Sequence, residues 1–176
     1  IHIDGGAAIG NAGIIDLGDK TLVIDSFNSV AAGKDLCNIA ESLFDRNIHS
    51  LVLTHVHSDH WIGATQFDAK TTYIATPKTA KENKRWGKAL LKDFQDPEQW
   101  NGWLKETEEI LKVEKDERVR AGLQVSLDRT RIMIAEMEGY QPRYPEKMLE
   151  APMMLDGSKR QVEIRSFGAG HSRDDV

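Results

Sequence analysis

The histidine-rich segment THVHSDH, residues 54–60, constrains this chain more than any other stretch. It contains three of the six histidines of the 176-residue sequence, together with one aspartate. It begins at the end of the apolar run SLVLT, which predicts a short buried strand. His55 and His57 are two residues apart, so at the end of a strand both imidazoles can face one point. Asp59 and His60 follow in a new turn and can reach a second point nearby.

Imidazole nitrogens and carboxylate oxygens are ligands of zinc-type metal ions, and such a site needs no thiolate. Three histidines crowded together without a metal would repel one another once protonated. The segment therefore indicates a loop that serves two adjacent metal ions, each incompletely. We expect His171 to complete the first site, because it lies in GAGHS, a glycine-flanked turn after a predicted strand. The other candidates, His2 and His49, are interpreted as surface residues.

The chain is predicted to form one α/β domain, residues 1–176. The apolar runs NAGIIDLG and KTLVIDS are separated by a Gly-Asp turn, which predicts a hairpin. Apolar residues at helical spacing predict a helix between 29 and 47, and TTYIAT predicts a strand at 71–76. Strands are expected again at 148–155 and 161–167. The sequence therefore predicts α/β structure both before and after its middle part.

The middle of the sequence, about 77–139, is predicted to be a helical insertion. A proline follows a capping residue at Thr76 and again at Asp96, which is typical of helix starts. A third helix is expected at about 115–138. The charged residues of this segment are interpreted as solvated faces. Its tryptophans, which are interpreted as core residues, are Trp86, Trp100 and Trp103.

Composition limits the classes of partner. The chain carries 28 acidic and 23 basic side chains, a net charge of −5, and has no basic stripe. This balance argues against nucleic acid and against an anionic membrane surface, and no apolar run approaches the roughly 20 residues that span a bilayer. We expect a small-molecule substrate, and an oligomer could form through the helical insertion. The single cysteine, Cys37, lies in a segment of helical spacing and is interpreted as a buried structural thiol rather than a catalytic one.

Both ends of the sequence lie inside expected strands, since the chain begins without methionine at IHIDGG and stops at DDV. We therefore interpret it as an incomplete domain of a longer protein. No signal peptide is visible. The cellular location stays open, with the cytoplasm as the preferred interpretation.

Several motifs resemble those of the metallo-β-lactamase superfamily. THVHSDH is similar to the HxHxDH signature of the family, and NAGII is similar to its early Asn-Gly strand. Asp25, at the end of KTLVID, resembles the aspartate that braces the site, and Gly63 lies where the family often has a glycine. GAGHSRDD resembles the third-motif turn in a form close to that of the zinc β-lactamases. The resemblance covers residues 5–76 and 148–176 and leaves the helical insertion outside.

The resemblance implies a four-layer αββα sandwich, here partial, with a metal site at the ends of the two sheets. The implied ligands are His55, His57 and His171 for a first zinc ion, and Asp59 and His60 for a second. The bridging aspartate or cysteine of the family and its last histidine have no counterpart, because five residues follow His171. Asp174 and Asp175 follow it too closely for that role, and they are interpreted as residues of the turn and of the next strand.

The resemblance also implies a zinc-dependent hydrolase, in which a metal-bound hydroxide attacks a small acyl substrate such as an ester, thioester, lactone or lactam. Asp59 would orient the nucleophile or accept its proton. Zinc, two ions per full-length chain, is the expected cofactor, although iron and manganese suit similar ligands. Two alternatives stay open. One is a β-lactamase proper, which GAGHS favours, and the other is a non-hydrolytic metal-binding or redox domain on the same fold.

Overall fold

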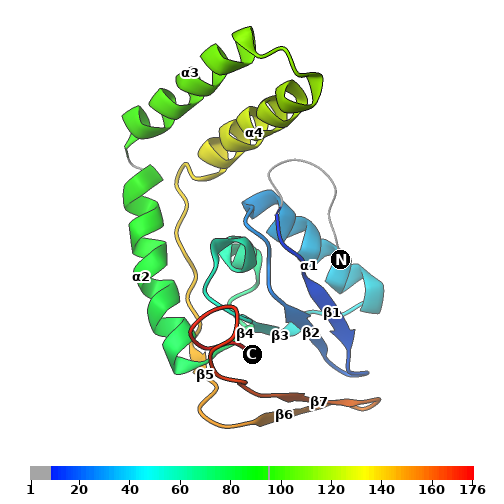
Figure 1. Ribbon diagram of the computed structural model, residues 1–176. Helices are drawn as coiled ribbons and strands as arrows, with labels where there is room; N and C mark the ends of the chain where they lie inside the picture. The colour runs from blue at the N-terminus through cyan, green and yellow to red at the C-terminus, as the bar shows by residue number, and fades with distance from the viewer. Residues whose placement is uncertain (1–8, 95) are drawn as a thin grey trace.

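A β-hairpin opens the part of the chain that the computed structural model describes, residues 9–94 and 96–176 (Figure 1). Strand β1, Gly13–Asp16, pairs antiparallel with β2, Thr21–Ile24. Between them Gly18 adopts a positive φ of 103°, and its N–H donates to the Asp16 carboxylate at 2.8 Å. Glycine adopts this conformation without strain. The predicted hairpin is confirmed.

Three parallel strands extend this hairpin into a five-stranded mixed sheet of order β1-β2-β3-β4-β5. They are β3, Ile48–Val52, β4, Thr72–Ala75, and β5, Lys147–Met148. The crossover from β2 to β3 runs through α1, Val30–Phe44. Because β2, β3 and β4 are parallel, their carboxyl ends lie at one edge of the sheet, where α/β proteins carry their sites. The histidine-rich segment follows β3 at this edge.

A second, two-stranded sheet covers one face of the first. Its strands, β6, Met153–Asp156, and β7, Gln161–Ile164, pair antiparallel. Side chains of β2, β3 and β4 alternate between the two faces of the large sheet. The residues that pack with α1 are Val23, Leu51 and Tyr73, and those that pack with β7 are Leu22, Val52 and Ile74. The α/β fold class is confirmed, and the described residues supply three layers of the sandwich: α1, the large sheet and the small sheet.

The expectation of one strand at 148–155 is wrong. The structure divides this stretch between β5 in the large sheet and β6 in the small sheet. The connection between them, 149–152, contains Pro152, which cannot donate a backbone hydrogen bond to a sheet. The apolar residues on either side of it pack against different strands. A continuous apolar pattern therefore concealed a change of sheet.

The helix α1 covers the large sheet and buries Cys37. Ser29 caps this helix by accepting a hydrogen bond from the Ala32 N–H at 3.2 Å. The carboxylate of Glu136, far along the chain, accepts further hydrogen bonds from the Val30 and Ala31 N–H groups. Burial raises the pKa of the Cys37 thiol to about 12. The interpretation of Cys37 as an inert structural thiol is confirmed.

Three helices follow β4, as predicted: α2, Pro77–Phe94, α3, Pro97–Val113, and α4, Glu117–Glu136. The α2 helix runs along the side of the sheets, whereas α3 and α4 extend away from them as a pair (Figure 1). Asp96 and Asp116 cap α3 and α4 through their carboxylates. We call α3 and α4 the helical arm. That these helices form an insertion within a single domain stays a prediction.

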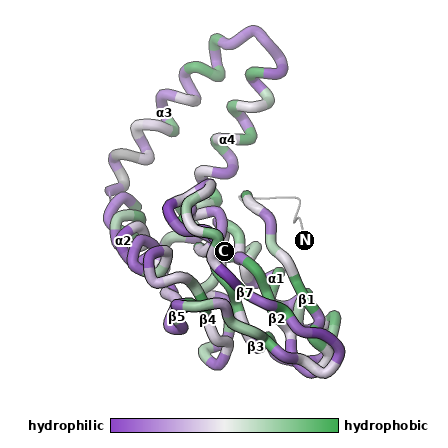
Figure 2. The backbone as a smooth tube through the Cα atoms, turned by 60° about the horizontal axis from the view of Figure 1, so that its bottom comes forward, coloured by the Kyte–Doolittle hydropathy of each residue, from purple (hydrophilic) through white to green (hydrophobic). Residues whose placement is uncertain are grey.

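The interpretation of the tryptophans as core residues is wrong for Trp86 and Trp103, which are 50% and 37% exposed. The helical arm buries little apolar surface. In α4, for example, Leu127 is the residue that is buried. Hydrophobic residues are concentrated in β1 and α1, whereas β7 and α2 are largely hydrophilic (Figure 2). Trp100 stacks on Phe94 with ring centroids 4.8 Å apart. Within the described ranges no helix is long and apolar enough to cross a membrane.

Candidate metal centre

The segment that carries the histidines is a tight turn locked to its neighbours. After β3 the chain forms two short 3₁₀ helices, Ser58–His60 and Ile62–Gln66. The buried indole of Trp61 donates to the Val56 carbonyl at 2.8 Å, and the Ser26 N–H donates to the His60 carbonyl at 2.9 Å. Hydrogen bonds thus join the loop after β3 to the loop after β2. This arrangement holds the histidines at the carboxyl edge of the sheet.

Gly63 permits this packing because it lies against backbone on two sides. A Cβ atom at Gly63 would lie 2.0 Å from the Ser26 carbonyl oxygen and 2.8 Å from the Gly33 Cα. No side chain can be accommodated at such distances. The glycine that the family resemblance singled out is therefore needed for contact between α1 and the loop.

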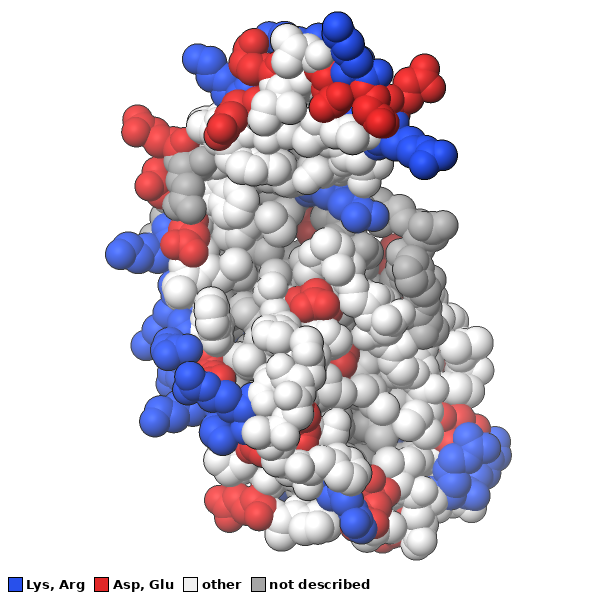
Figure 3. All heavy atoms as spheres, viewed as in Figure 1, with Lys and Arg blue, Asp and Glu red and all other residues white. Residues whose placement is uncertain are grey.

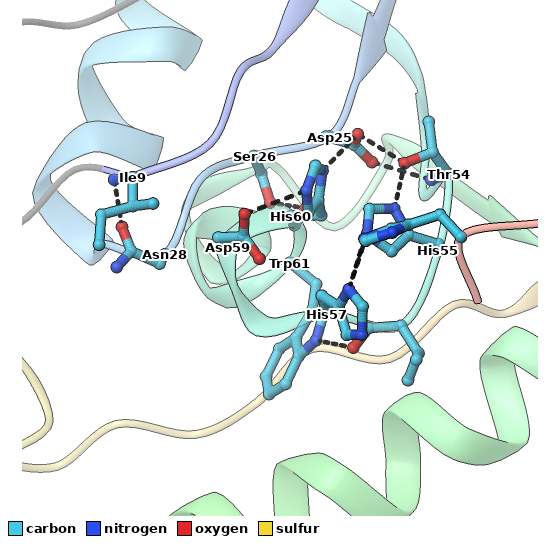
Figure 4. Close-up of polar contacts among 12 residues, drawn as sticks. Ile9, Asp25, Ser26, Asn28, Thr54, His55, His57, Asp59, His60 and Trp61 are labelled. Atoms are coloured by element: carbon cyan, nitrogen blue, oxygen red, sulfur yellow. Dashed lines mark hydrogen bonds and ion pairs between the residues drawn. The ribbon is translucent and has the colours of Figure 1, made fainter. Parts of the chain in front are cut away.

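Three imidazoles gather at the sheet edge, from His55, His57 and His171. Their potential ligand atoms all lie within 4.8 Å of one another. The His57 Nδ1 atom is 3.1 Å from His55 Nε2 (Figure 4). It is also 3.0 Å from His171 Nε2, although His171 is 114 residues away. With Zn–N distances of about 2.0–2.1 Å, two nitrogens of a tetrahedral zinc site lie roughly 3.3 Å apart. The two distances from His57 Nδ1 are close to this value, and the three ligand atoms lie within 4.8 Å of one another, so the cluster suits such an ion.

His55 is held in the orientation that a ligand needs. Its Nδ1 atom is 3.0 Å from the Thr54 hydroxyl, which in turn lies 2.7 Å from Asp25 Oδ2. Because the hydroxyl donates to the carboxylate, His55 Nδ1–H can donate to the hydroxyl oxygen, leaving the lone pair of Nε2 toward the other histidines. Burial, and next the neighbouring His60, lowers the pKa of His55. Both effects favour the neutral imidazole that binds metals.

Asp25 connects the two parts of this edge. Its carboxylate accepts hydrogen bonds from the Thr54 N–H at 2.8 Å and from the Thr54 hydroxyl, and it lies 2.7 Å from His60 Nδ1. The residue is buried and has a positive φ of 57°, an uncommon conformation for a residue with a side chain. These contacts agree with the bracing role that the resemblance implied.

Asp59 and His60 form a pair beside the three histidines. His60 Nε2 lies 3.2 Å from Asp59 Oδ2, and the His60 ring is centred 4.0 Å from that of His55. Burial lowers the pKa of His60, but the hydrogen bond and charge of Asp25, together with Asp59, outweigh it and raise the pKa. Within the described residues no third ligand gathers with this pair. A second metal site at Asp59 and His60 stays a prediction.

The turn that carries His171 is held from three directions. The Asp175 carboxylate accepts hydrogen bonds from the Ser172 N–H, and the Val176 N–H donates to the Thr54 carbonyl at 3.0 Å. From α2, the Thr79 hydroxyl donates to the Asp174 carbonyl at 2.8 Å. The Asp174 carboxylate accepts from the Ser166 hydroxyl at 2.7 Å, in agreement with its interpretation as a residue of the turn. Asp175 was expected to lead the next strand. It forms an isolated β-bridge with Gly168, and its carboxylate binds back into the turn.

The role of α2 in holding this turn was missed by sequence reasoning. Thr79 and Asp174 are 95 residues apart, as are Lys78 and Arg173, whose carbonyl accepts from the lysine ammonium at 2.8 Å. Neither contact has a local sequence pattern. His49 is exposed on β3 beside Ser50, which confirms its interpretation as a surface histidine. His2 lies outside the described residues.

A groove of about 360 Å³ opens beside His57, between the metal-binding loop and α2. Its walls include Val56 and Trp61 from the loop and Trp86 and Leu90 from the helix. A volume of this size is within the range of small-molecule sites. The groove shares His57 with the histidine cluster, so a molecule in it lies directly beside the cluster.

The fold and the site together define an α/β protein with a histidine cluster of metal-binding geometry at the carboxyl edge of its sheet. Residues 5–132 match the family described as the Metallo-beta-lactamase superfamily, and the chain belongs to this superfamily. The resemblance first noted in the motifs is thereby confirmed, but its expected extent is not. The match includes residues 77–132, which were expected to lie outside the resemblance, and it ends before residues 148–176.

Solved structures provide two further likenesses. One is a metallo beta lactamase from Hirschia baltica, with 24% identity and a TM-score of 0.39, covering 42% of this chain and 34% of that one. The other is a metallo beta lactamase from Erythrobacter litoralis with beta mercaptoethanol in its active site, with 19% identity and a TM-score of 0.38. That match covers 41% of this chain and 32% of the other. The chain thus spans about a third of each structure. No curated protein matches it.

Proposed function

We propose that the protein is a zinc-dependent hydrolase of small acyl substrates, such as an ester, thioester, lactone or lactam. The observation that carries the proposal is the convergence of His55, His57 and His171, with nitrogen spacings of 3.0 and 3.1 Å, in a member of this superfamily. Neutral imidazoles suit zinc, and iron and manganese are the alternatives. The net charge of −5 and the size of the groove favour a small molecule over nucleic acid.

The residues divide into two roles. His55, His57 and His171 hold the first ion, and Asp59 with His60 would hold a second. A bound zinc ion lowers the pKa of a coordinated water to roughly 7 and polarises the substrate carbonyl. Asp59, whose side chain is 34% exposed, can accept a proton or orient the attacking water, while His60 and Asp25 keep its carboxylate in position. Acyl transfer to water then needs no nucleophilic side chain.

Metal analysis of purified variants tests the proposal. Wild-type protein should carry zinc and release acid from simple esters, and His57→Ala should lose both properties together. His49→Ala is the matched control, because His49 lies on β3, the strand that leads into the His57 loop, but is outside the cluster. Hydrolysis that persists in metal-free His57→Ala would overturn the proposal. Metal binding without hydrolysis in the wild type would instead support the non-hydrolytic alternative.

A β-lactamase proper is the second candidate. It is favoured by the GAGHS turn, which the structure places beside His55 and His57. Turnover of nitrocefin, a chromogenic β-lactam, separates the two candidates. Efficient turnover of nitrocefin with poor turnover of simple esters would favour the β-lactamase.

A further inference from the structure

The groove beside His57 has one wall formed by a single face of α2. Trp86, Leu90 and Asp93 follow one another at spacings of four and three residues, so they lie on the same side of the helix. Trp86 is 50% exposed, an unusual state for so large an apolar side chain in a helix that packs against the domain. The opposite wall contains Val56 and the buried Trp61. Each wall therefore presents large apolar side chains to the groove.

The charges of the groove are all negative. Among its described lining residues are two carboxylates, Asp59 near the histidines and Asp93 at the far end of the α2 face, and no lysine or arginine. On α2, the Arg85 guanidinium lies 5.5 Å from the centre of the Trp86 ring but does not line the groove. In Figure 3 the surface between α2 and the sheets is mostly uncharged, with isolated carboxylates, and the basic side chains of that side lie on the outer edge.

We propose that this groove binds the uncharged, apolar acyl group of the substrate, with Trp86 and Leu90 as residues that determine specificity. An apolar chain gains free energy by leaving water against these side chains. A carboxylate at the far end of the groove meets Asp93 with no lysine or arginine among the described lining residues, which disfavours substrates with a terminal carboxylate. The proposal rests on the proposed hydrolase function and narrows it to neutral acyl compounds of medium length.

Three methyl esters test the proposal. They share a small leaving group, methanol, so they differ only in the acyl group. Methyl acetate has a minimal acyl group, methyl hexanoate has an apolar six-carbon one, and monomethyl adipate has the same length with a terminal carboxylate. For the wild type, kcat/KM measured by acid release should be highest for methyl hexanoate. Trp86→Ala should lower kcat/KM for methyl hexanoate about tenfold or more, the scale of lost apolar contacts in a substrate pocket, and leave methyl acetate within about twofold.

Two further variants control for general damage and for charge. Trp103→Ala removes an exposed tryptophan of α3 that lies outside the groove and should leave all three esters unchanged. Asp93→Lys should raise kcat/KM for monomethyl adipate about fivefold, the upper end of the effect of an exposed charge, with little change for methyl hexanoate. An equal loss for methyl acetate and methyl hexanoate in Trp86→Ala would overturn the proposal, as would faster hydrolysis of the adipate ester by the wild type.

Binding without turnover separates this proposal from the proposed function. Hexanamide and adipic acid monoamide have the same chain and cannot be hydrolysed readily, and their affinities can be measured by calorimetry on metal-free and metal-loaded protein. Hexanamide should bind more tightly than the monoamide, and Trp86→Ala should weaken hexanamide alone. If the protein shows this binding pattern but hydrolyses no ester, the proposed role of the groove in acyl binding is supported and the proposed hydrolase function is rejected. Equal affinity of both amides, or unchanged affinity in Trp86→Ala, would reject the groove even in an active hydrolase.

Discussion

At the scale of single residues, the site depends as much on small side chains as on ligands. The histidine loop can pack against α1 because two glycines meet there. A Cβ atom at Gly33 would lie 2.4 Å from the Gly63 carbonyl oxygen, and one at Gly63 would lie 2.0 Å from the Ser26 carbonyl oxygen. Both obstacles are backbone atoms, which cannot rotate away. Local glycines therefore set the position of the loop that carries His55 and His57.

Replacing Gly63 with alanine should destabilise the protein by about 1–3 kcal/mol or more, because the added methyl group overpacks the contact between α1 and the loop. Urea unfolding of the variant measures the loss. Gly122→Ala is the control, since nothing lies within 4 Å of a Cβ at that exposed position of α4. It should gain about 0.5–1 kcal/mol from the better helix propensity of alanine. Similar unfolding free energies in the two variants would contradict the close approach at Gly63.

Sequence reasoning found the residues whose role is local and missed those whose role is tertiary. The histidine spacing after an apolar strand indicated His55 and His57, and the glycine-flanked turn indicated His171. The Thr54 hydroxyl, which lies between Asp25 and His55, follows from the register of two parallel strands, and no local pattern marks it. Trp86 was misjudged because apolar side chains at helical spacing predict burial, whereas this face of α2 borders a groove.

At the scale of elements, periodicity predicted most helices and strands, since amphipathic spacing reflects which side of an element is covered. The third helix was expected at about 115–138 and is observed at Glu117–Glu136. The prediction failed at 148–155, where two short strands lie in different sheets. Strand order and the choice of sheet depend on contacts between distant segments. The sequence pattern of one segment contains little information about them.

The α2 helix is predicted to position the third metal ligand. Thr79→Val removes the hydroxyl that donates to the Asp174 carbonyl while preserving side-chain volume. Freed from this contact, the His171 turn should sample wider positions, and zinc affinity should fall about tenfold, the lower end of effects from residues that orient ligands. Competition with a chromogenic chelator measures the affinity.

Two variants check this prediction for α2. Thr79→Ser keeps the hydroxyl and should restore zinc affinity. Thr107→Val is the matched control, because Thr107 is also a buried helical threonine, and its hydroxyl donates within α3 to the Trp103 carbonyl. If Thr79→Val and Thr107→Val bind zinc equally well, α2 has no positioning role.

Glu136 is predicted to fasten the end of α4 to the start of α1. Its carboxylate accepts hydrogen bonds from the hydroxyl of Ser29, the N-cap residue of α1, at 3.0 Å and from the Val30 N–H at 2.9 Å. Glu136 thus adds to the capping of α1 by Ser29. Glu136→Ala should therefore destabilise the protein by about 1–2 kcal/mol, as other lost N-caps do. Chemical denaturation measures the change. Glu138→Ala, at an exposed neighbouring position, should change stability by less than about 0.5 kcal/mol. Equal effects would argue against the cap.

At the scale of the whole molecule, the histidine cluster joins two regions that are distant in sequence. His55 and His57 follow β3 in the large sheet, whereas His171 follows β7 in the small sheet. A metal ion held by all three would link the sheets at the edge where the groove opens. The helical arm extends away from this edge and contributes none of the three ligands. Metal binding should therefore stabilise the sandwich rather than the arm.

Removal of the metal is predicted to lower the thermal stability of the protein. An ion present at 100 times its dissociation constant stabilises the folded state by about 2.7 kcal/mol, provided that the unfolded chain does not bind it. For a chain of this length, that corresponds to a decrease in Tm of roughly 5–10 °C on chelation. Differential scanning calorimetry with and without chelator measures the shift.

Hydrogen exchange should locate the effect of metal removal. Chelation should increase exchange in the His171 turn, 168–176, and leave α3 and α4 unchanged, because local opening follows the contacts that are lost. His171→Ala should show a smaller zinc-dependent shift in Tm than the wild type, while His49→Ala should retain the full shift. A zinc-dependent shift of the same size in His171→Ala would show that the ion does not connect the two sheets. Protection gained mainly in the helical arm would place the ion elsewhere in the molecule.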